Sequence, residues 1–254
     1  WQPSDNLEIK TTAVVHRNDT GAQNTGEDEA GNYRQVVGGP VTPSGEDNYD
    51  LVNLLVNYDM GNIKLSSSTS YLDSDKEIAN WDVQCCAQIG GPGELQHDFY
   101  SLFQPPAEIL TQELRVASNG SGPWHWTAGL FYKDLRSGLN IPAGLFGTPG
   151  GTLGVDAFAY SFEQQNESQS WAVFGETSYE LSDKWEVGVG LRYFEDDRES
   201  QNGPTAPIQS ETFDSTNPKL FVSYHINDDI HLYANAAKGF RSGGFNSVGV
   251  PPYD

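Results

Sequence analysis

Residues 171–193 read WAVFGETSYEL, SDK and WEVGVGLRY, two alternating runs on either side of a three-residue polar turn. Alternate positions from Trp171 to Leu181 share one face, and alternate positions from Trp185 to Tyr193 form an apolar face. A period of two is that of a β-strand, and a short turn between two such runs predicts a hairpin. Aromatic residues stand near the ends of both faces, as in strands that cross a bilayer with their rings at headgroup level and polar groups facing a lumen.

The same alternation predicts seven further strands, which are residues 7–17, 48–59, 63–75, 107–117, 124–139, 212–226 and 230–241. With the central hairpin they make nine strands. Short turns at 60–62, 118–123, 182–184 and 227–229 alternate with long loops at 18–47, 76–106, 140–168 and 199–211. Short turns at one end and long loops at the other are typical of outer-membrane barrels. The expected fold class is therefore all-β, a transmembrane antiparallel up-and-down β-barrel.

The composition narrows the possible classes of function. The 254 residues carry a net charge of -21, with 35 acidic against 14 basic side chains, which argues against nucleic acid as a partner because phosphate contacts need Lys and Arg. Only 37% of the residues are hydrophobic while 12% are aromatic, as expected where one side of each strand meets lipid. The sequence has no run of about 18 apolar residues, which a transmembrane helix would need. No signal peptide is visible either, and we expect the natural N-terminus to lie upstream of Trp1.

Nine strands cannot form a complete bacterial barrel, because single-chain barrels have an even number of strands. An open sheet edge in lipid would also leave backbone groups unpaired, at a cost of several kcal/mol for each group. We therefore expect residues 1–254 to be an internal piece of a larger barrel that does not fold alone.

Six stretches of the sequence resemble the barrel of the TonB-dependent receptors of the outer membrane. They are LTQELRVAS at 110–118, WTAGLFY at 126–132, AVFGETSY at 172–179, DKWEVGVGLRY at 183–193, NPKLFVSY at 217–224 and LYANAAKGFRSGGFN at 232–246. The last of these, ending in KGFRSGGFN, is the most specific. The resemblance covers residues 108–246 well and residues 1–107 only as a strand pattern, and the siderophore-uptake members are the most similar in character.

This resemblance implies a barrel of about 22 strands with a plugged lumen. On this reading residues 1–254 are one partial barrel domain, and the N-terminal plug and the remaining strands lie outside them. The implied function is active transport across the outer membrane of a Gram-negative bacterium. The cargo would be a scarce nutrient, foremost a ferric siderophore, and the TonB complex would supply the energy through the N-terminal part of the receptor. The family is not enzymatic, and we expect no cofactor. Besides the cargo and the TonB complex, the expected partner is outer-membrane lipid.

Two sets of strand residues are candidates for function. Charged residues on the faces opposite the apolar ones are expected to face the lumen, where they pair with each other or with the plug, or are simply solvated. They are Glu113, Arg115, Glu176, Glu180, Glu186, Arg192 and Lys219. Aromatic residues near the strand ends are expected to form two membrane girdles. Tyr58, Trp124, Trp126, Tyr179 and Trp185 lie by the short turns, and Tyr71, Tyr132, Trp171 and Tyr193 lie by the long loops.

Ligand contacts are expected from aromatic residues of the long loops, although for each of them taken alone loop packing is the default role. The candidates are Tyr33, Trp81, Phe146, Phe158 and Tyr160. The adjacent Cys85 and Cys86 indicate no disulfide framework, and a redox or soft-metal site with His97 has no CxxC spacing to support it. The acidic clusters fit no EF-hand spacing and the five histidines no metal spacing, so no metal site is expected.

Two other classes of function stay open at this point. A passive porin would share the strands but not a plug, so the sequence upstream of Trp1 separates it from a receptor. A soluble extracellular β module for binding would need no detergent to stay in solution. An enzyme has the least support, because no Ser/His or Asp/His constellation can be identified on the predicted wall.

Overall fold

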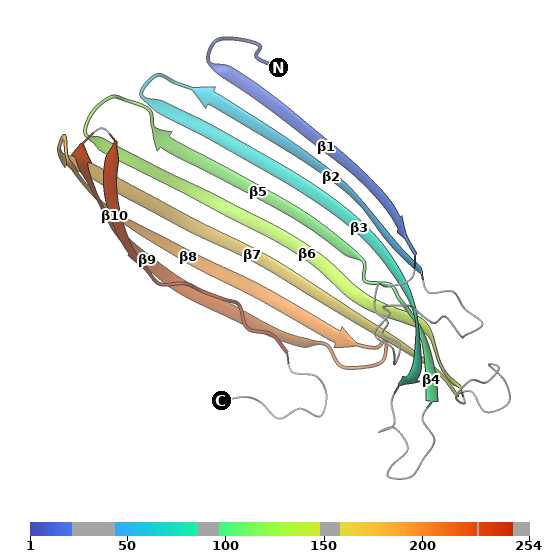
Figure 1. Cartoon of the computed structure of the whole chain (residues 1–254). Coiled ribbons are helices and arrows are strands. Elements are labelled where there is room, and N and C mark those ends of the chain that lie inside the picture. Colours follow the sequence, from blue (N-terminus) through green and yellow to red (C-terminus); the bar gives the residue numbers. More distant parts are fainter. Residues whose placement is uncertain (22–43, 86–96, 148–157, 228, 246–254) are drawn as a thin grey trace.

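The computed structural model describes residues 1–21, 44–85, 97–147, 158–227 and 229–245. They form one curved antiparallel sheet (Figure 1). The strands are β1 (Leu7–Thr20), β2 (Ser44–Asp59), β3 (Ile63–Cys85), β4 (His97–Phe103), β5 (Ala107–Ser118), β6 (Trp124–Gly147), β7 (Phe158–Ser182), β8 (Trp185–Asn202), β9 (Gln209–Asn227) and β10 (Ile230–Ala237). The described residues contain no helix long and apolar enough to cross a membrane.

The described part of the chain has ten strands where the sequence pattern predicted nine, because one strand position is broken in two. β4 and β5 both lie between β3 and β6. β4 pairs with the part of each neighbour nearest the long loops, and β5 pairs with the part nearest the short turns. Pro105 and Pro106 separate them, and proline has no N–H to donate to a ladder. The chain holds the break against β6 through Gln104, whose N–H donates to the Asn140 carbonyl at 2.8 Å.

Several strands extend well into segments that we predicted to be loops. β3 continues to Cys85, β6 to Gly147 and β8 to Asn202, while β7 already begins at Phe158. The prediction of loops at 76–106, 140–168 and 199–211 is therefore wrong for much of their length. These extensions mix apolar and polar residues without a regular alternation, because outside a bilayer no lipid imposes one. Backbone pairing with the neighbouring strands continues through them.

The last strand shows the opposite error. We predicted a strand over residues 230–241, but β10 ends at Ala237, where it still pairs with Lys219 of β9. The N–H of Lys238 donates to the Pro218 carbonyl at 3.0 Å. From there the chain leaves the sheet.

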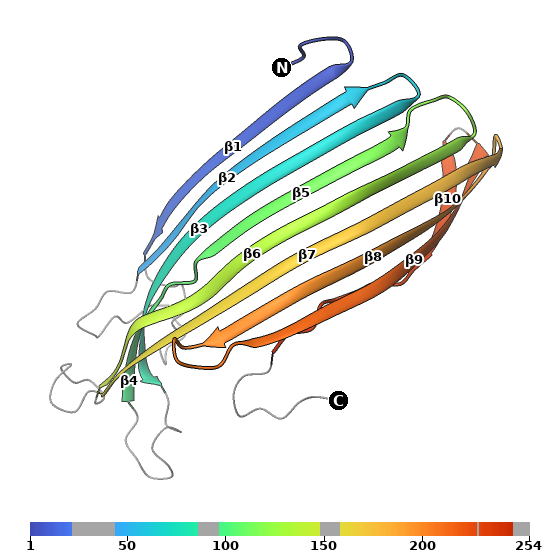
Figure 2. The ribbon, with the colours of Figure 1, turned by 180° about the vertical axis from the view of Figure 1, so that it is seen from behind.

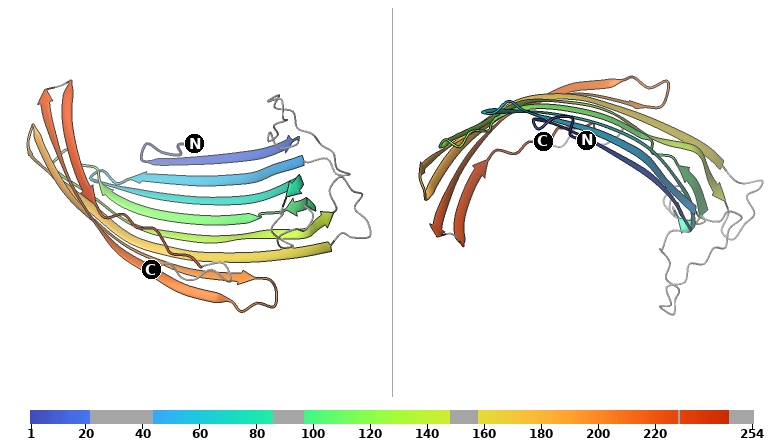
Figure 3. Two further views of the ribbon diagram at one scale, coloured as in Figure 1. Left: turned by 60° about the horizontal axis from the view of Figure 1, so that its bottom comes forward. Right: turned by 90° about the horizontal axis from the view of Figure 1, so that it is seen from above.

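The register assigns every strand residue to a convex or a concave face of the sheet, whose curvature is clear in Figures 2 and 3. The convex face carries the predicted apolar rows: Val173 is directly opposite Leu130 on one side and Tyr193 on the other. Its side chains are open to the surroundings, with Leu130 55% and Leu191 56% exposed. Among the described residues only Ala79, Ile141 and Ala172 are buried hydrophobic side chains. A single sheet with its apolar side outward has no interior core, and needs lipid to cover that side.

Candidate functional site

An apolar band crosses the convex face at a constant width. It runs from Ile63 to Tyr71 on β3, from Trp124 to Tyr132 on β6 and from Trp185 to Tyr193 on β8, nine residues in each case. A tilted strand needs about 9–11 residues to cross the hydrocarbon of a bilayer. The band therefore has the dimensions of a membrane-spanning wall.

Aromatic side chains edge this band at both ends. At the long-loop end the rings of Trp171 and Tyr193 lie 5.4 Å apart, and the Tyr193 hydroxyl donates to Glu195 at 2.9 Å. At the short-turn end Trp124 donates through Nε1 to Thr177 at 2.6 Å. An apolar ring with one satisfied polar atom is suited to a membrane–water boundary. That these aromatic residues form a membrane girdle stays a prediction. The nine predicted residues all lie on the convex face, joined by Tyr224, whose ring is 4.4 Å from that of Trp185 and which we did not predict.

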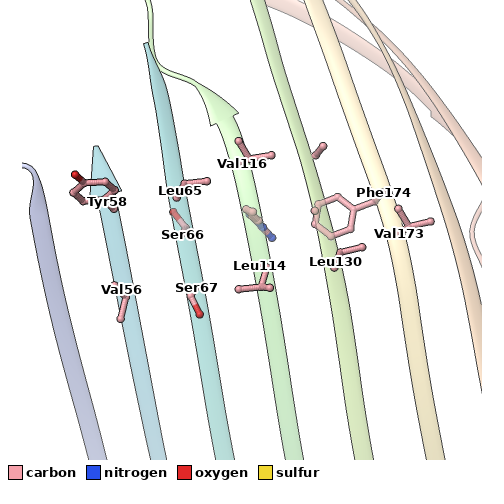
Figure 4. Close-up of a pocket in the computed structure, with 13 residues that line it drawn as sticks. Val56, Tyr58, Leu65, Ser66, Ser67, Leu114, Val116, Leu130, Val173 and Phe174 are labelled. Carbon is pink, nitrogen blue, oxygen red and sulfur yellow. The ribbon is translucent and has the colours of Figure 1, made fainter. Parts of the chain in front are cut away.

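A shallow depression of about 630 Å³ lies within the apolar band (Figure 4). Its apolar lining comes from five neighbouring strands, with Val56 and Tyr58 from β2, Leu65 from β3, Leu114 and Val116 from β5, Leu130 from β6 and Val173 from β7. The small side chains of Ser67 and Ala128 leave room between these larger ones. Its lining also includes Ser66, Arg115 and Phe174, which belong to the concave face by register.

The seven charged residues predicted to face the lumen all fall on the concave face by register. Some are paired there. Arg115 Nε lies 2.5 Å from Glu113 Oε1, and Lys219 Nζ lies 2.7 Å from Glu176 Oε2. Glu180 Oε1 is 3.1 Å from Nε2 of His125, a partner that the sequence did not reveal. Glu186 is directly opposite Glu180.

Arg192 stands among aromatic rings on the concave wall. Its guanidinium carbon lies 5.4 Å from the ring centre of Phe131, 5.8 Å from Phe174 and 5.6 Å from Phe194. Arg115 approaches Phe174 from the other side at 5.7 Å. Within the described ranges no carboxylate lies within 4.0 Å of the Arg192 nitrogens. Three rings thus hold a cation that keeps its hydrogen-bond donors available to an anion.

Two glycines allow the rings of Phe174 and Phe221 to lie against the concave face of the sheet. Gly129 is directly opposite Phe174, and a Cβ on Gly129 would come within 2.4 Å of that ring. Gly188 is directly opposite Phe221, and a Cβ there would come within 2.2 Å of the ring. Each ring therefore covers the backbone of the neighbouring strand at a position that has no side chain. These pairs could not be found in the sequence, because they depend on the register between strands.

Basic side chains are distributed unevenly between the two faces. Among the described strands, the concave face carries Lys10, Lys64, Lys76, Arg115, Lys133, Arg192, Arg198 and Lys219. The convex face carries Arg17 and Arg136, both beyond the outer aromatic row. In a chain with a net charge of -21, the concave face therefore has most of the cations.

The aromatic ligand candidates lie in strands rather than in loops, so their placement as loop residues is wrong. Trp81 is in β3, opposite Tyr100 of β4. Phe146 of β6 pairs with Phe158 of β7, and Tyr160 of β7 pairs with Gly144. All are at the long-loop end of the sheet. Tyr33 lies outside the described residues.

The cysteine pair was also expected in a loop, but Cys85 is the last residue of β3, opposite His97 of β4. Cys86 lies outside the described residues. Within the described ranges no group of three or more His, Cys, Asp or Glu residues could hold a metal ion.

Solved structures share this architecture. The ferric yersiniabactin uptake receptor FyuA from Yersinia pestis matches 92% of the chain with a TM-score of 0.69 at 15% identity, and the chain covers 35% of it. The ferric citrate transporter FecA matches 93% with a TM-score of 0.66 at 14% identity, and the chain covers 34% of it. In sequence, the pesticin receptor of Yersinia enterocolitica is 22% identical over 170 residues, 60% of this chain. The chain spans about a quarter of that relative's length, 24%.

The family model described as the β-barrel of TonB-dependent receptor-like proteins matches residues 1–252, nearly the whole chain. It accounts for the antiparallel sheet, the apolar convex band and the polar concave wall together. The expectation from the sequence motifs is confirmed: this chain belongs to the TonB-dependent receptors of the Gram-negative outer membrane and forms part of their β-barrel.

Proposed function

We propose that this chain is part of an outer-membrane receptor that takes up a ferric siderophore with energy from the TonB system. The proteins that share its fold include a ferric yersiniabactin uptake receptor, a ferric citrate transporter and the ferric-catecholate import receptor Fiu of E. coli. Carboxylate and catecholate chelates of iron carry negative charge. The observation that carries the proposal is Arg192, a cation held by three rings on the inner wall of such a barrel.

The unpaired cation on the concave face supports an anionic cargo. A basic group lowers the energy of an anion near it, and a narrow, low-dielectric passage strengthens that effect. The concave face also carries acidic residues, but Glu8, Asp47, Glu113 and Glu176 each form an ion pair with a basic residue of the same face. Arg192 has no carboxylate within 4.0 Å among the described residues. Aromatic residues near the long-loop end, among them Trp81, Phe146, Phe158 and Tyr160, are proposed to contact the cargo before it enters, and Tyr33 is proposed to join them.

The concave wall is proposed to face a plug domain in the complete receptor. In this arrangement residues 1–254 are one partial barrel domain, and an N-terminal plug and further strands complete it. Glu113 with Arg115 and Glu176 with Lys219 already neutralise each other within the wall. Arg192 and Glu186 are the wall charges proposed to meet groups of the plug, because a buried charge needs a partner.

Uptake of radioactive iron by a Gram-negative strain that carries the full-length receptor as its only iron receptor tests the function. A panel of ferric chelates should show import of at least one, and import should stop when the TonB gene is deleted. Import that continues without TonB would indicate passive passage, as through a porin. No import of any ferric chelate, with the receptor folded in the outer membrane, would contradict iron as the cargo.

Substitutions of two arginines distinguish a role in the lumen from a role on the outer surface. Arg192→Gln removes the ring-held cation, while Arg17→Gln removes an exposed cation that pairs with Asp50 at 2.7 Å on the convex face. Only the first should lower uptake or loosen the plug, as measured by its release in guanidinium. Equal effects of both substitutions would contradict a lumen role for Arg192.

A further inference from the structure

After β10 the chain crosses the concave face of the sheet instead of continuing along the wall (Figure 3). Residues 238–245 form this segment, which we name the inner strap. Its Phe240 ring lies 5.3 Å from the ring of Phe194 in β8. Arg198 of β8 donates through a guanidinium nitrogen to the Gly243 carbonyl. The strap is therefore fixed to the inside of β8 by both an aromatic contact and a hydrogen bond.

Asp196 lies at the centre of this contact. Asp196 is only 2% exposed. The hydroxyls of Ser168 and Ser170 donate to its Oδ1 at 2.6 and 2.8 Å. Both serines are themselves buried. Burial alone would raise the pKa of the Asp196 carboxyl, but the neighbouring hydroxyls of Ser168, Ser242 and Ser170 hold it below its usual range. The carboxylate thus joins β7, β8 and the strap, with Arg198 as a nearby cation at 3.8 Å.

The strap also fits the wall sterically at one glycine. A Cβ on Gly243 would come within 2.3 Å of the Phe213 ring, which belongs to β9 and is directly opposite Asp196. Gly239, at the start of the strap, has no atom within 4 Å of its own Cβ position. The close approach is therefore required at Gly243 but not at Gly239. Gly243 is part of the KGFRSGGFN string that is the most specific feature of the sequence.

We propose that the inner strap is a permanent lining of the barrel interior and that Asp196 is the positioning residue that fixes it there. A buried carboxylate is tolerated only when hydrogen bonds satisfy it, and Ser168 and Ser170 supply them here. The carboxylate also lies 3.8 Å from Arg198, which donates to the Gly243 carbonyl of the strap. The surface that faces the lumen over β8 and β9 is then the strap and not the sheet. Arg241, between Phe240 and Ser242, is an exposed residue of this strap.

Thiol labelling of the full-length receptor in outer-membrane vesicles tests this proposal independently of transport. In a Cys85→Ser, Cys86→Ser background, one variant carries Ser242→Cys on the strap and a reference variant carries Gly239→Cys. The thiol at 242 should react with a water-soluble maleimide at least about tenfold more slowly than the thiol at 239, because it is clamped against the wall. Equal rates at the two positions would overturn a permanent lining.

The role of Asp196 is tested in the Ser242→Cys receptor. Asp196→Ala should accelerate labelling at 242 by about tenfold, because it removes the carboxylate beside Arg198, whose guanidinium donates to the Gly243 carbonyl of the strap. The matched control is Asp214→Ala, which removes an exposed carboxylate from the opposite face of β9. If Asp196→Ala leaves the rate unchanged, Asp196 does not fix the strap.

A second variant keeps the test decisive if Asp196→Ala fails to give the heat-modifiable folded barrel. Gly243→Val leaves the carboxylate in place but forces the strap away from the Phe213 ring, so it should accelerate labelling at 242 as well. Gly239→Val, placed where no atom is near, should not. Equal labelling rates in these two variants would contradict the clamped fit.

Discussion

Val189→Arg tests whether the convex face of the sheet lies in lipid. Val189 is the fifth of the nine residues from Trp185 to Tyr193, so it lies at the middle of the apolar band, and it is 53% exposed. An arginine on the lipid face of a barrel costs about 2–4 kcal/mol at the bilayer midplane and about 0–1 kcal/mol near the interface. We therefore expect the full-length receptor to lose about 2–4 kcal/mol of unfolding free energy.

Two controls vary the face and the depth of the same substitution. Thr127→Arg introduces the charge on the concave face, opposite Glu176, and Asp214→Arg introduces it on the convex face beyond the outer aromatic row. Both should cost no more than about 1 kcal/mol. Guanidinium unfolding of the receptor in phospholipid vesicles, followed by tryptophan fluorescence, measures all three. A Val189→Arg variant as stable as Thr127→Arg would refute the assignment of the convex face to lipid.

Three further predictions concern individual contacts. Gly129→Val should cost about 1–3 kcal/mol through overpacking against Phe174 and the Leu114 carbonyl, so Phe174→Leu should remove only part of that cost in a double-mutant cycle of unfolding free energies. The pair of Glu176 and Lys219, both partly exposed, should couple by about 0.2–1 kcal/mol, and raising the salt concentration should abolish the coupling. Gly61 in the turn between β2 and β3 has φ of 85°, so Gly61→Ala should lower the unfolding free energy by about 1–2 kcal/mol; an unchanged midpoint in guanidinium would contradict this.

The part of the fold that touches lipid could be predicted from sequence, because lipid imposes a regular pattern on it. Each crossing needs alternate apolar residues over about nine positions, and runs such as Trp185–Tyr193 show them without interruption. The bounds of the strands beyond the bilayer could not be predicted. There no lipid imposes an alternation, and residues such as those at the ends of β6 and β7 pair through the backbone with no side-chain pattern to reveal it.

The concave wall was predicted only as a list of charges. Alternation places Arg192 on the face opposite Val189 and Leu191, which is enough to direct it inward. Its three ring neighbours come from β6, β7 and β8, and their meeting depends on the register between strands, which the sequence does not encode locally. The inner strap was missed for a related reason: the alternation of β10 fades at Ala237, but only the contact with Asp196 shows where the chain goes next.

The position of the sheet along the bilayer normal follows from the acidic residues just outside the apolar band. One step beyond Tyr71, the carboxylates of Asp50, Asp73 and Glu108 lie in consecutive positions across β2, β3 and β5. Like charges directly opposite each other are unfavourable even in water and far more so in hydrocarbon. A shift of the receptor that buried this row would therefore meet a steep cost, while a shift the other way would expose the apolar band. We therefore expect the acidic row and the aromatic row next to it to fix the depth of the barrel together, so that the acidity of the convex face serves placement in the membrane.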